Sequence, residues 1–168
     1  TIGMLPAGQK ILASFFQSVT TRTAGFASIS QDGMTDSSKV VSDILMFIGG
    51  SSGSTAGGAK TVTIGVLLLS ALGTARGRSR ITAFKRTITR EQIENASSLV
   101  LLLFVLAVGG GLYLSAANGC SFMNAVFETI SALATVGLST GITPTLGAAS
   151  KIILICYMFS GRVGIMTI

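Results

Sequence analysis

The sequence contains no histidine and no tryptophan, and only two of its 168 residues are cysteines. Without histidine, a Ser-His-Asp triad cannot be completed within the chain. Cys120 and Cys156 lack metal-ligand spacing, so both are expected to be buried as small apolar residues. No carboxylate pair sits at working spacing among the acidic residues, which are Asp32, Asp36, Asp43, Glu91, Glu94 and Glu128. These absences predict that the chain is not an enzyme.

Charged residues are also scarce. They make up 11% of the chain, against about a quarter in soluble domains. Hydrophobic residues make up 49%, the mean hydropathy is +0.72, and there are 21 glycines. This composition predicts an all-α integral membrane protein with closely packed backbones.

The net charge of +6 is concentrated, because half of the 12 basic residues lie within residues 76–90. Since this stretch separates apolar segments, the positive-inside rule predicts a cytoplasmic loop rather than a nucleic-acid site.

The apolar residues form long runs. Residues 96–117 carry no charge and match the roughly 20 residues that a spanning helix needs. A second run, from Val40 to Leu72, is interrupted by GGSSGSTAGGAKT at 49–61, and a third begins near Ile152. The chain starts without Met and stops inside an apolar run, so we expect it to be a piece of a longer protein.

Two shorter helical segments, 11–19 and 121–134, are too short to span a membrane. They run into TAGF at 23–26 and TVGL at 135–138. A half-spanning helix followed by extended backbone is typical of a re-entrant loop. Such a loop is tolerated at membrane depth only where protein buries it or where it lines a water-filled path.

The chain also repeats itself at a shift of 112 residues without a gap. The unit is a half-helix, a filter-like turn and a spanning helix. The matching pairs are Phe15 with Phe127, Thr23 with Thr135, Gly25 with Gly137, 38–41 with 150–153, and 46–49 with 158–161.

The glycine-rich stretch at 49–61 resembles two enzyme motifs, and each fails. A Walker motif needs lysine directly after its last glycine, but Ala59 separates Gly58 from Lys60. GGSSG at 49–53 matches a nucleophile elbow, but no histidine can complete the triad. The stretch is therefore expected to interrupt the second apolar run without serving as either enzyme motif.

The Thr-x-Gly turns suit potassium conduction. Carbonyl oxygens of such turns replace the water of a potassium ion, and glycine supplies the unusual φ that this needs. A simpler alternative is that both turns are helix C-caps with glycine at the C′ position. The shared register of the two copies favours the pore.

The chain resembles the membrane subunits (KtrB) of Ktr-type potassium uptake systems in the Trk/Ktr/HKT superfamily. The resemblance implies a four-repeat, potassium-channel-like fold. Residues 1–75 would be the third repeat without its outer helix, 76–94 a basic cytoplasmic linker, and 95–168 the fourth repeat with a truncated inner helix. The segments that carry the resemblance are FFQSVTTRTAGF (15–26), LMFIGGSSGSTAGGAKT (45–61), FKRTITREQI (84–93), TVGLSTGITP (135–144) and MFSGRVG (158–164).

The resemblance also implies the site residues. Potassium would be bound at Gly25 and Gly137 by a filter in which Phe26 and Leu138 replace the tyrosine of strict channels. The filter residues would be Thr23, Ala24, Gly25, Phe26, Thr135, Val136, Gly137 and Leu138. The gate residues would be Gly49, Gly50, Ser51, Ser52, Gly53, Ser54, Thr55, Ala56, Gly57, Gly58 and Arg162.

The repeat register adds one detail about the gate, because Arg162 falls on Gly50 at the start of the loop. A charge inside an apolar span usually faces the bundle interior or water. The simpler alternative is a snorkelling residue near a helix end, and the resemblance favours the gate. The expected partners of the arginine are Ser51, Ser52, Ser54 and Thr55.

The function that the resemblance implies is potassium uptake across a bacterial plasma membrane by a multi-pass homodimer, sodium-dependent in some members. A cytosolic nucleotide-binding ring (KtrA, ATP or ADP) would regulate it. A non-conducting scaffold for a cytosolic partner is the alternative. Arg22 is expected either to tune cation access or to form an ion pair that holds the pore helix. Glu128 is expected to be a hydrogen-bond anchor, with an ion site as the alternative.

Overall fold

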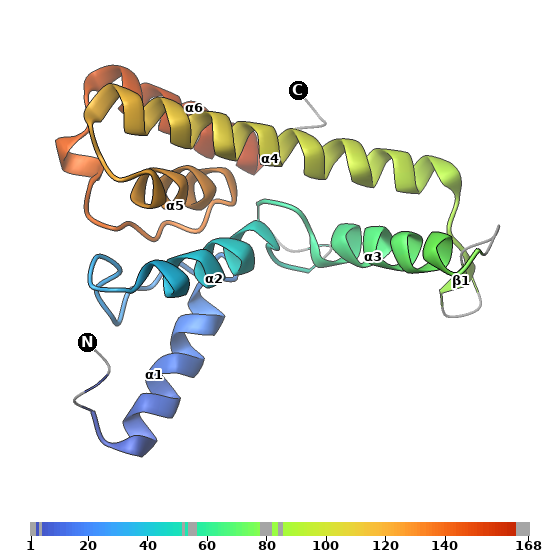
Figure 1. The fold of residues 1–168 in the computed structure, drawn as a ribbon, viewed down its shortest axis with the longest axis horizontal. Coiled ribbons are helices and arrows are strands. Elements are labelled where there is room, and N and C mark those ends of the chain that lie inside the picture. Colours follow the sequence, from blue (N-terminus) through green and yellow to red (C-terminus); the bar gives the residue numbers. More distant parts are fainter. Residues whose placement is uncertain are drawn as a thin grey trace.

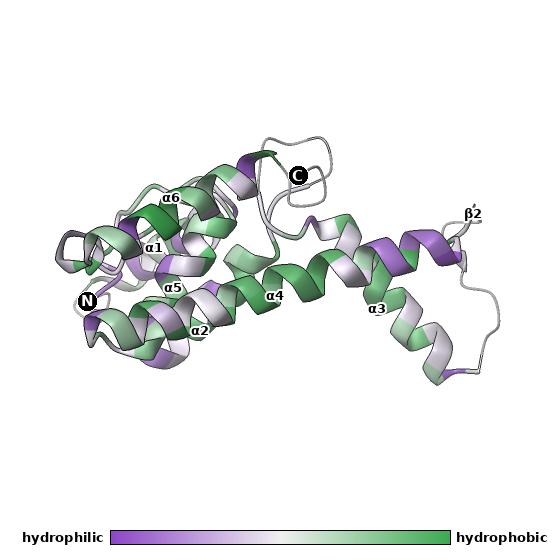
Figure 2. Ribbon diagram, turned by 90° about the horizontal axis from the view of Figure 1, so that it is seen from above, coloured by the Kyte–Doolittle hydropathy of each residue, from purple (hydrophilic) through white to green (hydrophobic). Residues whose placement is uncertain are grey.

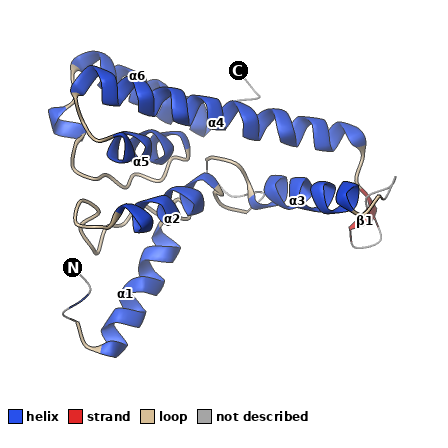
Figure 3. Cartoon of the chain, viewed as in Figure 1, coloured by secondary structure: helices blue, strands red, loops and turns tan. Residues whose placement is uncertain are grey.

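The computed structural model describes residues 3, 5–51, 53, 57–77, 82–83 and 86–163. Helices dominate it (Figures 1 and 3). In chain order the elements are α1 (Ala7–Thr20), α2 (Asp36–Phe47), α3 (Thr61–Ala75), β1 (Thr82–Ala83), β2 (Arg86–Thr87), α4 (Arg90–Asn118), α5 (Phe122–Leu133), the 3-10 turn η2 (Thr143–Thr145) and α6 (Ala148–Val163).

The longest helix, α4, contains the predicted span 96–117. A capping box formed by Thr89 and Gln92 begins it, and Gly119 in a left-handed conformation ends it. Within the described ranges, α4 is the one helix long and apolar enough to cross a membrane by length and composition. Figure 2 shows hydrophilic residues at its end near the hairpin and hydrophobic residues along its middle.

The second apolar run is two helices with an irregular segment between them. Helix α2 runs from Asp36 to Phe47 and is capped by Thr35, whose hydroxyl accepts the N–H of Ser38. The helix resumes as α3 at Thr61. The break predicted at 49–59 therefore lies between two observed helices.

Helix α5 forms the centre of the packing. Figure 1 shows it between the α4–α6 pair and α2, and it packs against all three. Its Phe127 is fully buried and joins Met46 of α2 and Ala107 of α4 in one apolar cluster. Val136 and Leu138, which follow α5, belong to the same cluster, so the packing fixes the segment after the helix.

The basic linker contains a feature that the sequence did not predict. Thr82–Ala83 pairs with Arg86–Thr87 as a two-residue antiparallel hairpin. Apart from this hairpin and one isolated bridge between Ile48 and Ala59, the described chain is helix, turn and loop, in agreement with the all-α prediction.

The two cysteines differ from expectation. Cys120 is half-buried, and its thiol donates to the carbonyl of Leu114 at 3.6 Å. Cys156 is exposed on α6, so the prediction that both are buried is wrong. Helix α6 also begins at Ala148, earlier than the apolar run near Ile152, because its first turn is built from small and polar residues.

Candidate functional site

The two Thr-x-Gly segments take the same backbone turn. In the first turn (residues 23–25), φ is 63° at Thr23 and 75° at Gly25; in the second turn (residues 135–137), φ is 53° at Thr135 and 88° at Gly137. Among the described residues, these two threonines are the only non-glycine residues with positive φ. A β-branched residue in this region is strained, and such strain is often found at functional sites.

The second turn closes the end of α5 in a Schellman-like pattern. The N–H of Thr135 donates to Ala132 and that of Val136 donates to Ser131. Glycine normally occupies the left-handed position after such a helix cap, but here Thr135 does, while Gly137 lies two residues further on. The simple C-cap alternative, with glycine at C′, therefore does not describe this turn.

A hydroxyl from the last turn of each preceding helix holds the residue after the glycine. Thr20 donates to the carbonyl of Phe26 at 2.7 Å, and Ser131 donates to the carbonyl of Leu138 at 2.6 Å. Thr20 and Ser131 are buried. Sequence reasoning missed both, although a hydroxyl six or seven residues before the held carbonyl recurs in the two copies.

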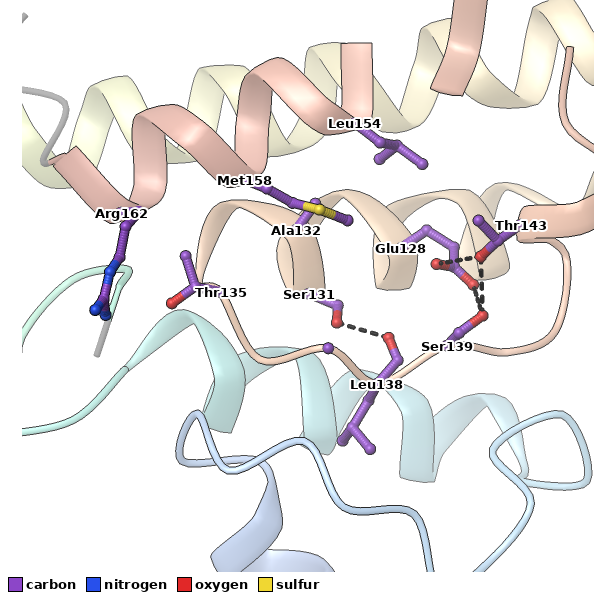
Figure 4. A pocket seen from close by; sticks show the side chains of 11 residues that line it. Glu128, Ser131, Ala132, Thr135, Leu138, Ser139, Thr143, Leu154, Met158 and Arg162 are labelled. Carbon is purple, nitrogen blue, oxygen red and sulfur yellow. Dashed lines mark hydrogen bonds between the residues drawn. The ribbon is translucent and has the colours of Figure 1, made fainter. Parts of the chain in front are cut away.

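Beyond each turn, a buried polar side chain of the helix holds the chain as it leaves. Glu128 accepts hydrogen bonds from the hydroxyls of Ser139 and Thr143 (Figure 4). It also accepts the N–H of Thr140. This confirms the prediction that Glu128 is a hydrogen-bond anchor. In the first copy, the Gln17 amide donates to Gln31 at 2.7 Å, a pair that sequence reasoning also missed.

The two turns lie against each other. A Cβ placed on Gly25 would overlap the carbonyl oxygen of Val136 and lie 3.6 Å from the Cα of Gly137. The absence of a side chain at Gly25 is therefore what allows this close approach. The structure thus brings together two glycines that are far apart in the sequence.

The two ends of the glycine-rich loop (residues 49–59) pair with each other. Gly49 N–H donates to Ala59 at 2.9 Å, and Ala59 N–H donates to Phe47 at 3.2 Å, as a short parallel bridge. Thr61 N–H adds a bond to Gly50 at 3.2 Å. These bonds satisfy backbone groups that the break in the helix would leave free. Four of the predicted gate residues, Ser52, Ser54, Thr55 and Ala56, lie outside the described residues.

The base of this loop packs on the end of α5. Gly57 N–H donates to the Thr135 hydroxyl at 3.1 Å. A Cβ on Gly57 would lie 3.0 Å from the Ala134 carbonyl, and one on Gly58 would lie 3.2 Å from the Ala134 Cβ. The loop base therefore reaches the start of the second turn.

Helix α6 reaches the same place. A Cβ on Gly161 would overlap the carbonyl oxygen of Leu133 and approach the Thr135 methyl group at 3.1 Å. The next residue, Arg162, is exposed and lies beside Thr135 at one end of a cavity of about 430 Å³ (Figure 4). The cavity also includes Gly137 and Glu128.

Arg22 forms backbone hydrogen bonds, a role that differs from both the predicted tuning of cation access and the predicted ion pair. Its guanidinium Nη1 donates to the carbonyl of Ile48 at 2.8 Å and that of Gly49 at 3.5 Å. It binds backbone carbonyls where α2 ends and does not use a carboxylate partner in these contacts. Cationic donors suit the free carbonyls at a helix C-terminus.

Comparison with known proteins identifies the family. The family model of TrkH, a cation transport protein, matches residues 1–168. The potassium/sodium uptake protein NtpJ of Enterococcus hirae is 40% identical over 164 residues, which are 95% of this chain and 36% of NtpJ. Ktr system potassium uptake protein B of Bacillus subtilis is 40% identical over 99% of this chain and 38% of its own. The Vibrio alginolyticus protein of the same name is 35% identical over 100% and 37%, respectively.

The chain thus spans between 36% and 38% of the length of these three relatives. The family model nevertheless extends from its first residue to its last. The chain belongs to the TrkH family of cation transport proteins and is KtrB-like within it.

Proposed function

We propose that this chain forms two of the four walls of a potassium pore through which the ion crosses a membrane down its electrochemical gradient. The observation that carries the proposal is the shared turn at Thr23–Gly25 and Thr135–Gly137, with left-handed φ at the same two positions. A potassium ion needs carbonyl oxygens in place of its water. A backbone with left-handed φ at every second residue can present such oxygens, and glycine adopts this φ without strain.

Three further features support this role for the turns. Thr20 and Ser131 hold the carbonyls of Phe26 and Leu138, so the backbone beside each glycine is fixed. Helices α1 and α5 end at the turns, which directs their negative C-terminal dipoles toward a cation. The contact between Gly25 and the Val136 carbonyl suits neighbouring walls around one axis.

The names of the relatives indicate which ions are transported. NtpJ is called a potassium/sodium uptake protein and its Ktr relatives potassium uptake proteins. Phe26 and Leu138 stand where strict channels have tyrosine, which suits a filter that sodium also influences. We extend both cations to this chain, with potassium as the main cargo and sodium as a co-determinant of uptake.

The glycine-rich loop (residues 49–59) and Arg162 would form the gate. Support comes from the loop base, whose Gly57 bonds to Thr135 at the start of the second turn. Arg162 follows Gly161, which abuts the same threonine. A guanidinium at this position would repel cations, so the loop and the arginine together suit a barrier beneath the turns.

The proposed partners and location rest on the same resemblance. Helix α4 would cross a bacterial plasma membrane as one of several spans, and the basic linker would face the cytosol. By resemblance, the full protein would be a homodimer regulated by the KtrA ring with bound ATP or ADP. A scaffold without conduction is the competing function.

Rubidium uptake by the full-length protein tests the pore. Gly137→Ser puts a side chain at φ 88°, so we expect uptake to fall by at least about tenfold. Gly33→Ser is the matched control, because Gly33 is exposed and has no atom near its Cβ position. Unchanged uptake in Gly137→Ser would support the scaffold.

The gate has its own test in the same assay. Deletion of residues 51–57 should raise rubidium influx, because the barrier is removed. Arg162→Ala should act in the same direction. With correct membrane assembly shown by surface labelling, unchanged or abolished influx in the deletion, or a fall in influx in Arg162→Ala, would contradict the gate.

A further inference from the structure

The glycine-rich loop is bonded at both of its ends to residues that adjoin the two turns. At its start, the carbonyls of Ile48 and Gly49 accept hydrogen bonds from Arg22, the residue directly before the first turn. At its other end, Gly57 N–H donates to the hydroxyl of Thr135, the first residue of the second turn. The partners are separated by 26 and 78 residues in the sequence, so both contacts are products of the fold.

We infer that Arg22 and Thr135 are positioning residues that hold the two ends of the loop, at Gly49 and at Gly57, when the gate is closed. Moving these ends away would break one bond to the residue before the first turn and one bond to the second turn. The inference rests on the proposed pore and gate. It assigns the closed position of the loop to two named contacts, the Arg22 contact and the Gly57–Thr135 contact.

The Gly57–Thr135 hydrogen bond is part-buried, so breaking it is costly. Gly57 is buried, and its Cβ position is filled by the Thr135 hydroxyl at 2.8 Å and the Ala134 backbone at 3.0 Å. A buried N–H that loses its acceptor is left unsatisfied. The threonine side chain has little room to rotate, because its methyl group lies against Gly161 of α6, where a built Cβ would approach it at 3.1 Å.

The Arg22 contact complements it at the other end. The carbonyls of Ile48 and Gly49 lie just past the end of α2, where a helix leaves its acceptors free and its dipole is negative. A guanidinium is suited to this place, because it is always charged and its Nη1 alone carries two N–H donors, which reach both oxygens. The copies are not symmetric here, since position 134, which matches Arg22, is an alanine packed on Gly58.

A paired substitution at Thr135 tests the inference in the full-length protein. Thr135→Val keeps the shape and removes the acceptor, whereas Thr135→Ser keeps the acceptor and removes the methyl group. The quantity measured is the ratio of rubidium influx, valine over serine, first with the loop intact and then with residues 51–57 deleted. Because both variants alter the turn itself, only the change in this ratio between the two backgrounds reports on the loop.

We expect the ratio to be about threefold or more higher with the intact loop than in the deletion, as the loss of one hydrogen bond predicts. An equal or lower ratio with the intact loop would overturn the inference. Arg22→Gln against Arg22→Lys provides a second pair that leaves the turn residues unchanged. With the intact loop, rubidium influx should be higher in Arg22→Gln than in Arg22→Lys by a similar factor, and in the deletion the two should be about equal. A higher influx in Arg22→Gln in both backgrounds would also overturn the inference.

Gly137→Ser, measured in the same experiment, separates the two proposals. If Gly137→Ser conducts like the parent, the pore itself fails. If Gly137→Ser is inactive and the ratios do not depend on the loop, the pore stands and the role of the two contacts is wrong.

Discussion

Gly25 of the first turn lies directly against the Val136 carbonyl of the second turn, leaving no room for a Cβ. Gly25 also has φ of 75°, a conformation that side chains rarely adopt. One glycine therefore meets two requirements, one in its own backbone and one at the boundary with the other copy. Gly137 meets only the first, because its Cβ position is open.

This difference predicts that Gly25→Ala is more damaging to structure than Gly137→Ala. The first substitution forces the two turns apart and strains the backbone, whereas the second only strains the backbone. We expect Gly25→Ala to lower the melting temperature in detergent further than Gly137→Ala, with both reducing rubidium uptake. Gly33→Ala is the control. Equal melting temperatures for the two turn variants would contradict the contact between the turns.

Glu128 predicts a second effect, on stability. Glu128→Ala leaves the donors of Ser139, Thr140 and Thr143 without their common acceptor, so we expect a loss of about 2–4 kcal/mol in unfolding free energy. The control is Glu94→Gln, which removes an exposed ion pair with Arg90 and should change stability by no more than about 0.5 kcal/mol. Chemical denaturation in detergent measures both. Similar losses would show that Glu128 is not an anchor.

The close packing at Gly161 leads to a third prediction, which also concerns stability. A methyl group there overlaps the Leu133 carbonyl, so Gly161→Ala must displace α6 from the end of α5 and reduce stability. Gly65→Ala is the matched helical control, because nothing lies near its Cβ position in α3 and alanine favours a helix. We expect the melting temperature of Gly161→Ala to fall and that of Gly65→Ala to stay or rise. The reverse order would contradict the close packing of α6 on α5.

The sequence alone predicted the elements well because the signals were periodic or compositional. The uncharged run at 96–117 lies in α4, and the short segments at 11–19 and 121–134 correspond to α1 and α5. The repeat register is reflected in helix starts at Asp36 and Ala148, which are 112 residues apart. The absence of catalytic patterns agrees with a transporter family, so the prediction that the chain is not an enzyme is confirmed.

Other features could not be predicted, because they depend on contacts between distant segments. The bond from Gly57 to Thr135 joins residues 78 apart, and no local pattern indicates it. The left-handed φ of Thr135 runs against the preference of a β-branched residue, so only the surrounding packing explains it. Cys156 was expected to be buried, but an apolar helix at the edge of this bundle also has an outward face.

Thr20 predicts an effect on ion selectivity. Its buried hydroxyl holds the Phe26 carbonyl at 2.7 Å, so Thr20→Val removes a donor without changing the side-chain volume much. In the proposed pore, a carbonyl released from this bond would reorient more freely, and a filter with less fixed carbonyls would discriminate less between cations of different size. We expect the rubidium-over-sodium uptake ratio to fall several-fold in Thr20→Val. Thr20→Ser keeps the hydroxyl, so its ratio should stay within about twofold of the parent, the effect of less than one net hydrogen bond. If valine and serine variants discriminate equally well, the hydroxyl does not set selectivity, and the bond to Phe26 serves packing alone.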